Sequence, residues 1–145
     1  MEFNSENLVR IIEVIKNNLT TDLLSKEWLN RNYGNPMAGH CYHASAVLQQ
    51  IFGTKNIKLM RAIDDEGEYH WWCETSEGHL IDITEDQYFS RGLTPPHDKG
   101  QKESALGFSY RYKVGVLYER VMAEVEDRKS TLDKFMPDLI LGDVD

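Results

Sequence analysis

Residues 39–48 read Gly39-His40-Cys41-Tyr42-His43-Ala44-Ser45-Ala46-Val47-Leu48. This stretch predicts the start of a helix running over about residues 40–52, which Gly53 is well placed to cap at its carboxyl end. The small side chains at positions 44–46 would let that helix approach a sheet closely. Cys41 stands at the amino end of the helix, where unpaired N–H groups and the helix dipole stabilise an anion.

Three runs of residues typical of strands follow the helix, at about 56–63, 68–74 and 79–84. Because only short turns separate them, we expect an antiparallel meander. Together with the helix before it, this meander predicts an α+β fold in which helices pack on an antiparallel sheet of at least three strands.

The turn at residues 76–78 predicts the register of the last two strands. Its sequence, Ser-Glu-Gly, fits a three-residue hairpin loop with glycine in the left-handed region. That loop pairs Thr75 with His79, and therefore Trp72 with Asp82. His70 and Asp82 then share one face as diagonal neighbours. A loop of two or four residues would turn Asp82 to the opposite face.

Further helices are expected on both sides of this central region. Leu8, Ile11, Ile12 and Ile15 recur at helical spacing over residues 5–18, with Ser5 as a candidate N-cap. A short helix over about residues 21–31 would bury Leu23, Leu24, Trp28 and Leu29. Residues 32–36 are rich in turn formers and predict an irregular loop.

The pattern is weaker after residue 84. Residues 85–110 predict no regular element, and they contain the long loop Thr94-Pro95-Pro96-His97-Asp98-Lys99-Gly100, either a corner or a lid over a site. Apolar residues at helical spacing predict a last helix over about 111–127. We therefore expect a single domain over residues 1–130, followed by an acidic tail over residues 131–145 that is loosely ordered.

The composition limits the classes of function. The chain has 145 residues, a net charge of −8 and a pI near 5.1, so binding to nucleic acid is disfavoured. No apolar run is long enough to span a bilayer, and the polar amino terminus does not resemble a secretory signal. The two cysteines are expected to be reduced thiols, which indicates a cytoplasmic protein.

Cys41, His70 and Asp82 occur in the order and setting of a thiol nucleophile, its base and the group that orients the base. We expect the N–H groups that favour the thiolate to hold the oxyanion of a tetrahedral intermediate as well. Cys73 lies three positions after His70 on the same strand, so it should face the opposite side and belong to the core.

A zinc site is the competing chemistry, because several potential ligands cluster in this region. They are His40, Cys41, His43, His70, Cys73 and His79. Their spacing is poor for one metal ion, since His70 and Cys73 face opposite sides of a strand and Cys41 and His43 are about 200° apart around a helix. We therefore expect neither a metal nor an organic cofactor.

The three phrases around these residues resemble the papain-like superfamily and, within it, the transglutaminase-like arrangement. Cys41 matches the nucleophile that starts a helix, His70 with Trp71-Trp72 matches the base, and Asp82 with Ile83-Thr84 matches the third member. The three phrases are also similar to phrases found in small proteins of bacteria and their viruses. In this chain Gln87 would complete the last of them, which begins at Asp82.

The resemblance implies amide chemistry at a thiol: proteolysis, glutamine deamidation, acyl transfer to an amine, or cleavage of a small amide. The substrate would then be a protein, a peptide or another amide. Tyr42 replaces the tryptophan that usually follows the nucleophile. The upstream oxyanion donor stays open between Asn35, Asn32 and backbone N–H groups alone. The alternative is a binding module, such as an inhibitor or accessory protein, that keeps the fold without turnover.

Overall fold

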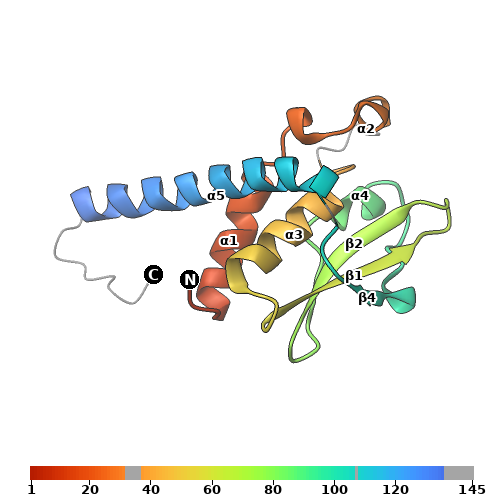
Figure 1. The fold of residues 1–145 in the computed structure, drawn as a ribbon, viewed down its shortest axis with the longest axis horizontal. Coiled ribbons are helices and arrows are strands. Elements are labelled where there is room, and N and C mark those ends of the chain that lie inside the picture. Colours follow the sequence, from red (N-terminus) through yellow and green to blue (C-terminus); the bar gives the residue numbers. More distant parts are fainter. Residues whose placement is uncertain (32–36, 107, 136–145) are drawn as a thin grey trace.

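The computed structural model describes residues 1–31, 37–106 and 108–135 of the chain (Figure 1). It confirms the expected α+β architecture, with helices packed on a four-stranded antiparallel sheet in the order β3-β2-β1-β4. The strands are β1 (Ile57–Ile63), β2 (Tyr69–Thr75), β3 (Leu80–Ile81) and β4 (Gln101–Glu103). The helices are α1 (Ser5–Asn17), α2 (Lys26–Asn30), α3 (Cys41–Phe52), α4 (Asp86–Phe89) and α5 (Phe108–Phe135), with short 3-10 turns η1 (Thr21–Leu23) and η2 (His97–Lys99).

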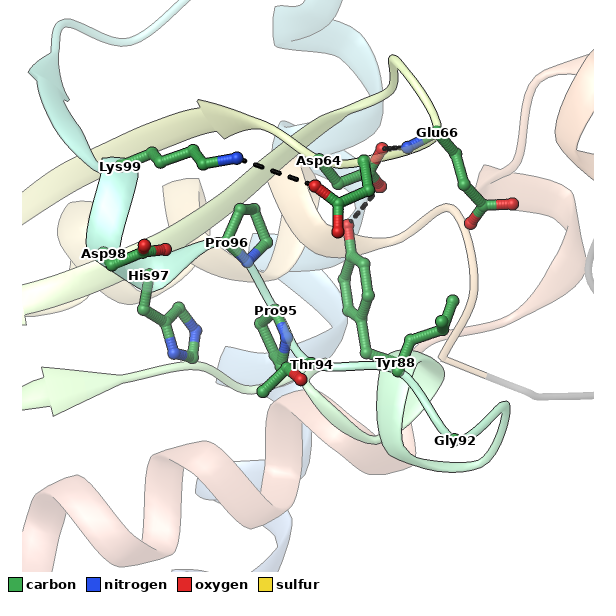
Figure 2. Close-up of a pocket in the computed structure, with 12 residues that line it drawn as sticks. Asp64, Glu66, Tyr88, Gly92, Thr94, Pro95, Pro96, His97, Asp98 and Lys99 are labelled. Carbon is green, nitrogen blue, oxygen red and sulfur yellow. Dashed lines mark hydrogen bonds and ion pairs between the residues drawn. The ribbon is translucent and has the colours of Figure 1, made fainter.

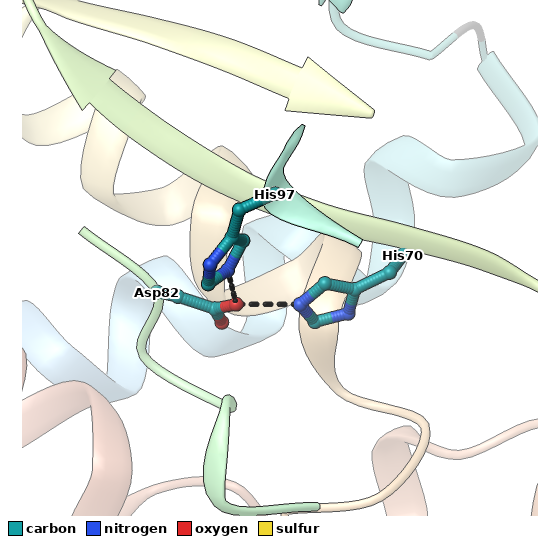
Figure 3. Close-up of side chains that lie close together, drawn as sticks. All are labelled: His70, Asp82 and His97. Atoms are coloured by element: carbon teal, nitrogen blue, oxygen red, sulfur yellow. Dashed lines mark hydrogen bonds and ion pairs between the residues drawn. The ribbon is translucent and has the colours of Figure 1, made fainter. Parts of the chain in front are cut away.

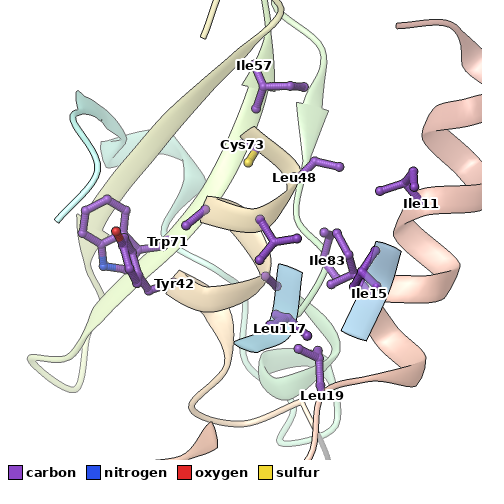
Figure 4. Packing of buried hydrophobic residues seen from close by; sticks show 14 of the residues in the cluster. Ile11, Ile15, Leu19, Tyr42, Leu48, Ile57, Trp71, Cys73, Ile83 and Leu117 are labelled. Atoms are coloured by element: carbon purple, nitrogen blue, oxygen red, sulfur yellow. The ribbon is translucent and has the colours of Figure 1, made fainter. Parts of the chain in front are cut away.

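Helix α3 lies against the centre of the sheet, and α1 and α5 cover it on its other side (Figure 1). The small residues of α3 allow it to approach the sheet closely. The approach brings the Cys73 thiol of β2 within hydrogen-bonding distance of the Ser45 carbonyl oxygen of α3, to which it donates at 3.4 Å. Leu48 of α3 and Leu117 of α5 are fully buried between these layers (Figure 4). Cys73 belongs to the same buried cluster, as its position on the strand predicts.

The hairpin between β2 and β3 has the predicted register. Cys73 pairs with Ile81 and Glu74 with Leu80, and the Thr75 N–H donates to the His79 carbonyl oxygen at 2.8 Å. The turn depends on Gly78, whose φ of 89° lies in the left-handed region. Continuing this register by one pair places Asp82 opposite Trp72, on the His70 face of the sheet.

The amino-terminal helices differ from the prediction in two details. The N-cap of α1 is Asn4, not Ser5, since the Asn4 side chain accepts the Asn7 N–H at 2.8 Å. The helix expected over residues 21–31 is divided into η1 and α2, because Leu24 is extended and Ser25 caps a new helix. Leu29 is consequently 46% exposed instead of buried. The predicted loop at residues 32–36 lies outside the described residues.

The carboxyl-terminal half contains more regular structure than the sequence pattern predicts. Helix α4 and strand β4 fall within residues 85–110, and β4 pairs with β1 through Leu59 and Glu103. Helix α5 ends at Phe135, so it extends past residue 131, where the acidic tail was expected to begin. Residues 136–145 lie outside the described part of the chain. None of the described helices has the length and apolar content that crossing a bilayer would demand.

Candidate active site

His70 and Asp82 meet as the register of the hairpin predicts. His70 lies on β2 and Asp82 directly follows β3, and Nε2 of His70 is 2.6 Å from Oδ2 of Asp82 (Figure 3). Their side chains are only 1% and 0% exposed. An imidazole and a carboxylate in contact away from water form a strong charge-assisted hydrogen bond.

Cys41 is the first residue of α3 and is half-buried beside His70. Burial lowers the pKa of His70, but hydrogen bonds with Asp82 and with the Cys41 sulfur outweigh it and raise the pKa to about 9. Because Asp82 occupies Nε2, Nδ1 is the ring nitrogen that is left to exchange a proton with the thiol. The structure thus brings together the three residues predicted as nucleophile, base and orienting group.

Asp82 is held in its ionised form by its donors. Burial raises its pKa, but hydrogen bonds from His70 and from His97 more than compensate, so the pKa lies below its usual value. Oδ2 is 2.7 Å from Nε2 of His97 as well as 2.6 Å from that of His70, and Oδ1 accepts the Thr84 N–H at 3.2 Å. The buried carboxylate therefore has hydrogen-bond donors at both oxygens.

His97 is the member of the site that the sequence did not reveal. It lies on η2, 15 residues after Asp82, and its side chain is 23% exposed. The loop over residues 94–100 was expected to be a corner or a lid. Its His97 lies against Asp82, and the loop contributes no lining residue to the two pockets beside Cys41, so it does not cover them as a lid would. The length of the loop was the only signal in the sequence that pointed to it.

The same loop packs closely on β2. The Trp72 ring is stacked with His70 at 5.7 Å between ring centroids and meets the edge of His97 at 5.0 Å. Gly100 follows, and a methyl group added there would lie 2.4 Å from Cζ2 of Trp72. The backbone of the loop thus contacts the almost completely buried indole of Trp72.

We expect Gly100→Ala to lower the free energy of unfolding by about 1–3 kcal/mol, because the added methyl group overpacks a rigid, fully buried indole. Urea denaturation followed by tryptophan fluorescence would measure the change. Gly115→Ala is the matched control, since Gly115 lies within α5 and no atom lies within 4 Å of the added methyl group. Equal stability of Gly100→Ala and wild type would contradict the close contact.

Gln87 adds an amide beside the base. Its Nε2 donates to Thr84 Oγ1 at 3.1 Å and lies 3.5 Å from Nδ1 of His70. Gln87 also lines the small pocket that Cys41 and His70 border. The side chains considered as upstream oxyanion donors, Asn32 and Asn35, lie outside the described residues. The backbone N–H groups at the start of α3 remain next to Cys41.

Cys41 borders a second and larger pocket of about 580 Å³. The aromatic side chains of its wall are Trp28, Tyr42, Tyr69 and Trp71. The Arg61 guanidinium lies over the Tyr69 ring at 4.4 Å and pairs with Glu103 at 3.0 Å. Cys41 therefore lies in the wall of an open groove that is lined by both aromatic and charged side chains.

Another pocket, of about 600 Å³, lies on the far side of His97 (Figure 2). Residues 64–66 and 92–99 form most of its wall, and Cys41 is not among its lining residues. Its Asp64 carboxylate already accepts the Tyr88 hydroxyl at 2.8 Å, and Lys99 pairs with Asp65 at 3.6 Å. This pocket gives solvent access to His97 without exposing Asp82.

The ligand types that zinc prefers occur at His70, Asp82 and His97, whose nearest donor atoms lie within 4.8 Å of one another. The two N···O separations of 2.6 and 2.7 Å are hydrogen-bond lengths. Donors around a tetrahedral zinc ion are roughly 3.3 Å apart, given metal–ligand distances of about 2.0–2.1 Å. These three side chains fit a hydrogen-bonded cluster better than a metal centre.

The other candidate zinc ligands do not join this cluster. His79 is exposed and Cys73 is in the core, where burial raises the pKa of its thiol to about 12. His40 and His43 are buried, and burial lowers the pKa of each to about 4. Their Nδ1 atoms have no hydrogen-bond partner among the described residues.

Residues 5–126 match the family model described as YunG protein. No curated protein and no solved structure matches the chain. The matched region covers most of the sequence and includes the four clustered side chains Cys41, His70, Asp82 and His97. The chain belongs to the YunG protein family.

Proposed function

We propose that this protein is a cysteine-dependent amide hydrolase or acyltransferase in which Cys41 is the nucleophile, His70 the base and Asp82 the orienting group. The observation that carries the proposal is the position of His70, whose Nε2 contacts a buried carboxylate and whose pKa is raised by its interactions with that carboxylate and with the neighbouring Cys41 sulfur. This is the arrangement by which a triad makes a weak nucleophile reactive, and it supports the resemblance to papain-like and transglutaminase-like enzymes.

The reaction follows from these positions. His70 accepts the Cys41 proton at Nδ1, and the thiolate attacks the amide carbonyl carbon. The N–H groups at the start of α3 stabilise the oxyanion. As the C–N bond breaks, His70 returns the proton to the leaving amine, and an acyl thioester remains on Cys41. Water, or a second amine in acyl transfer, then attacks the thioester while His70 accepts its proton. The C–S bond breaks, the acyl product leaves, and Cys41 returns as a thiolate beside protonated His70.

The surroundings of the site support a protein or peptide amide as the substrate. The groove beside Cys41 has a volume of about 580 Å³, and its wall combines aromatic side chains with charged groups of both signs. The net charge of −8 opposes a nucleic-acid substrate. The free state of Cys41 and Cys73 is consistent with a reducing compartment such as the cytoplasm.

Alkylation tests the thiolate–imidazolium pair without knowledge of the substrate. We expect iodoacetamide to modify Cys41 of the wild type at pH 6 about tenfold faster than in His70→Ala. An ordinary cysteine is only roughly 0.3% ionised at pH 6. A histidine that takes the thiol proton increases the amount of thiolate, and this gain outweighs the lower intrinsic nucleophilicity of a paired thiolate. Mass spectrometry of Cys41-containing peptides over time would give the rate.

Cys73 supplies the internal control, because it is 1% exposed and should stay unmodified in both proteins. A Cys41 rate that is the same in wild type and His70→Ala would overturn the proposed function. The reaction type would come from incubating candidate proteins with wild type and Cys41→Ala. Deamidation adds 1 Da, loss of ammonia on crosslinking removes 17 Da, and proteolysis yields fragments. The open groove at Cys41 favours turnover over the binding-module alternative.

A further inference from the structure

His97 contacts the same carboxylate oxygen as the base. Nε2 of His70 and Nε2 of His97 lie 2.6 and 2.7 Å from Oδ2 of Asp82, while the Thr84 N–H binds Oδ1 (Figure 3). An ionised carboxylate oxygen has two lone pairs and can accept both N–H groups. Three donors from three segments of the chain therefore fix the plane of a carboxylate that no water reaches.

We propose that His97 is a positioning residue of the reaction, which orients Asp82 so that Asp82 can orient His70. The inference rests on the proposed function. With Oδ2 accepting from both rings, His70 keeps a proton on Nε2, and Nδ1 is the nitrogen that exchanges a proton with Cys41. Without His97, one lone pair of a buried oxygen loses its partner, and the carboxylate is free to turn away from His70.

His97 acts through Asp82 and not on the substrate. It lines neither of the pockets beside Cys41, and the indole of Trp72 packs against both the His70 and His97 rings. His97 instead belongs to the wall of the pocket formed by residues 64–66 and 92–99 (Figure 2). The close contact of Gly100 with Trp72 and the burial of Pro95 and Pro96 hold the loop that carries His97 in place.

The chemistry of the side chain separates a positioning role from a purely structural one. In His97→Gln the amide nitrogen can occupy the place of Nε2 and still donate a hydrogen bond to Asp82. In His97→Phe a ring of similar size remains against Trp72, but no donor faces the carboxylate. A structural role predicts that the stability changes and the reactivity of Cys41 does not.

The test is the pH profile of Cys41 alkylation by iodoacetamide between pH 5 and 9 in wild type, His97→Gln, His97→Phe and His70→Ala. We expect His97→Phe to lower the rate at pH 6 by about three- to tenfold and to move the profile toward higher pH. His97→Gln should stay within about twofold of wild type. Near-ultraviolet circular dichroism would confirm that each variant is folded.

The outcomes distinguish the two proposals. If His97→Phe matches the wild-type profile while His70→Ala does not, His97 has no positioning role and the proposed function stands. If His70→Ala also matches the wild type, the proposed function fails. Zinc retained by the wild type at one equivalent after gel filtration, and lost in His97→Phe, would replace the positioning role with a metal site.

A measurement on the unmodified protein keeps the inference testable if His97→Phe does not fold. Nitrogen-15 NMR of the histidine rings distinguishes a protonated from a bare Nε2. We expect both His70 and His97 to carry a proton on Nε2 near neutral pH. A His97 ring with a bare Nε2 cannot donate to Asp82 and would overturn the inference.

Discussion

Asp82→Asn is expected to slow the hydrolysis of p-nitrophenyl acetate by about 10³-fold while the protein stays folded. An amide has only one oxygen. In the wild type the Thr84 N–H donates to Oδ1 of Asp82 at 3.2 Å. If the amide oxygen of the variant faces the two histidines, the amide N–H₂ takes the place of Oδ1 and opposes this N–H. If the amide is turned round, its N–H₂ opposes Nε2 of His70, and the ring must carry its proton on Nδ1. That tautomer cannot accept the Cys41 proton.

Initial rates of p-nitrophenol release would measure this loss, with Cys41→Ala giving the background. Asp65→Asn is the matched control, because the Asp65 side chain is 99% exposed and lies apart from the pockets at Cys41. A rate for Asp82→Asn within about threefold of wild type would show that the orientation of His70 does not depend on this carboxylate.

The stability of the fold is expected to fall steeply as the pH drops from about 6.5 to 4. Burial lowers the pKa of both His40 and His43 to about 4, with further lowering by the charge of Lys113, whereas an unfolded histidine titrates near 6.5. In this window the unfolded chain binds protons that the folded chain does not. Each histidine can lower the free energy of unfolding by at most about 1.4 kcal/mol for each pH unit. The two together can therefore lower it by up to about 2.7 kcal/mol for each pH unit.

Urea denaturation at pH 7, 6, 5 and 4.5 would give this slope. His43→Gln should reduce it by about half, whereas His79→Gln should leave it unchanged because His79 is exposed. An unaltered slope in His43→Gln would show that the buried imidazole is not the group that opposes protonation. The carboxylates with lowered pKa, Asp22 and Asp82, add their loss of stability only below about pH 3.8.

His70 makes the free energy of unfolding fall as the pH rises, on the alkaline side of pH 6.5. Its folded pKa of about 9 lies above the unfolded value near 6.5, so its stabilising contribution is complete below pH 6.5 and is lost as the pH rises to about 9. The greatest stability is therefore expected near pH 6.5, between the window of His40 and His43 and that of His70.

The central part of the fold was predictable because local rules determine it. A glycine at position 78 selects a three-residue turn, the turn fixes the pairing of Thr75 with His79, and the alternation of side chains then places His70 and Asp82 on one face. The small residues of α3 likewise predicted its close packing on the sheet. Each of these inferences uses residues that are near one another in the sequence or directly paired.

The predictions failed where a choice depends on distant contacts or on fine competition between caps. Asn4 and Ser5 are both good N-caps, and the structure uses Asn4. Strand β4 is three residues long, and its pairing with β1 supplies a stabilisation that the segment does not show in isolation.

The order of Cys41, His70 and Asp82 along the chain, and the face on which the last two lie, followed from the sequence, because strand pairing and helix ends obey short-range geometry. Folding alone revealed that His97 completes the carboxylate's set of donors. Fifteen residues of loop separate His97 from Asp82, and no periodic pattern relates the two. Their contact depends on how that loop packs against Trp72, through interactions that exist only once the whole domain has formed.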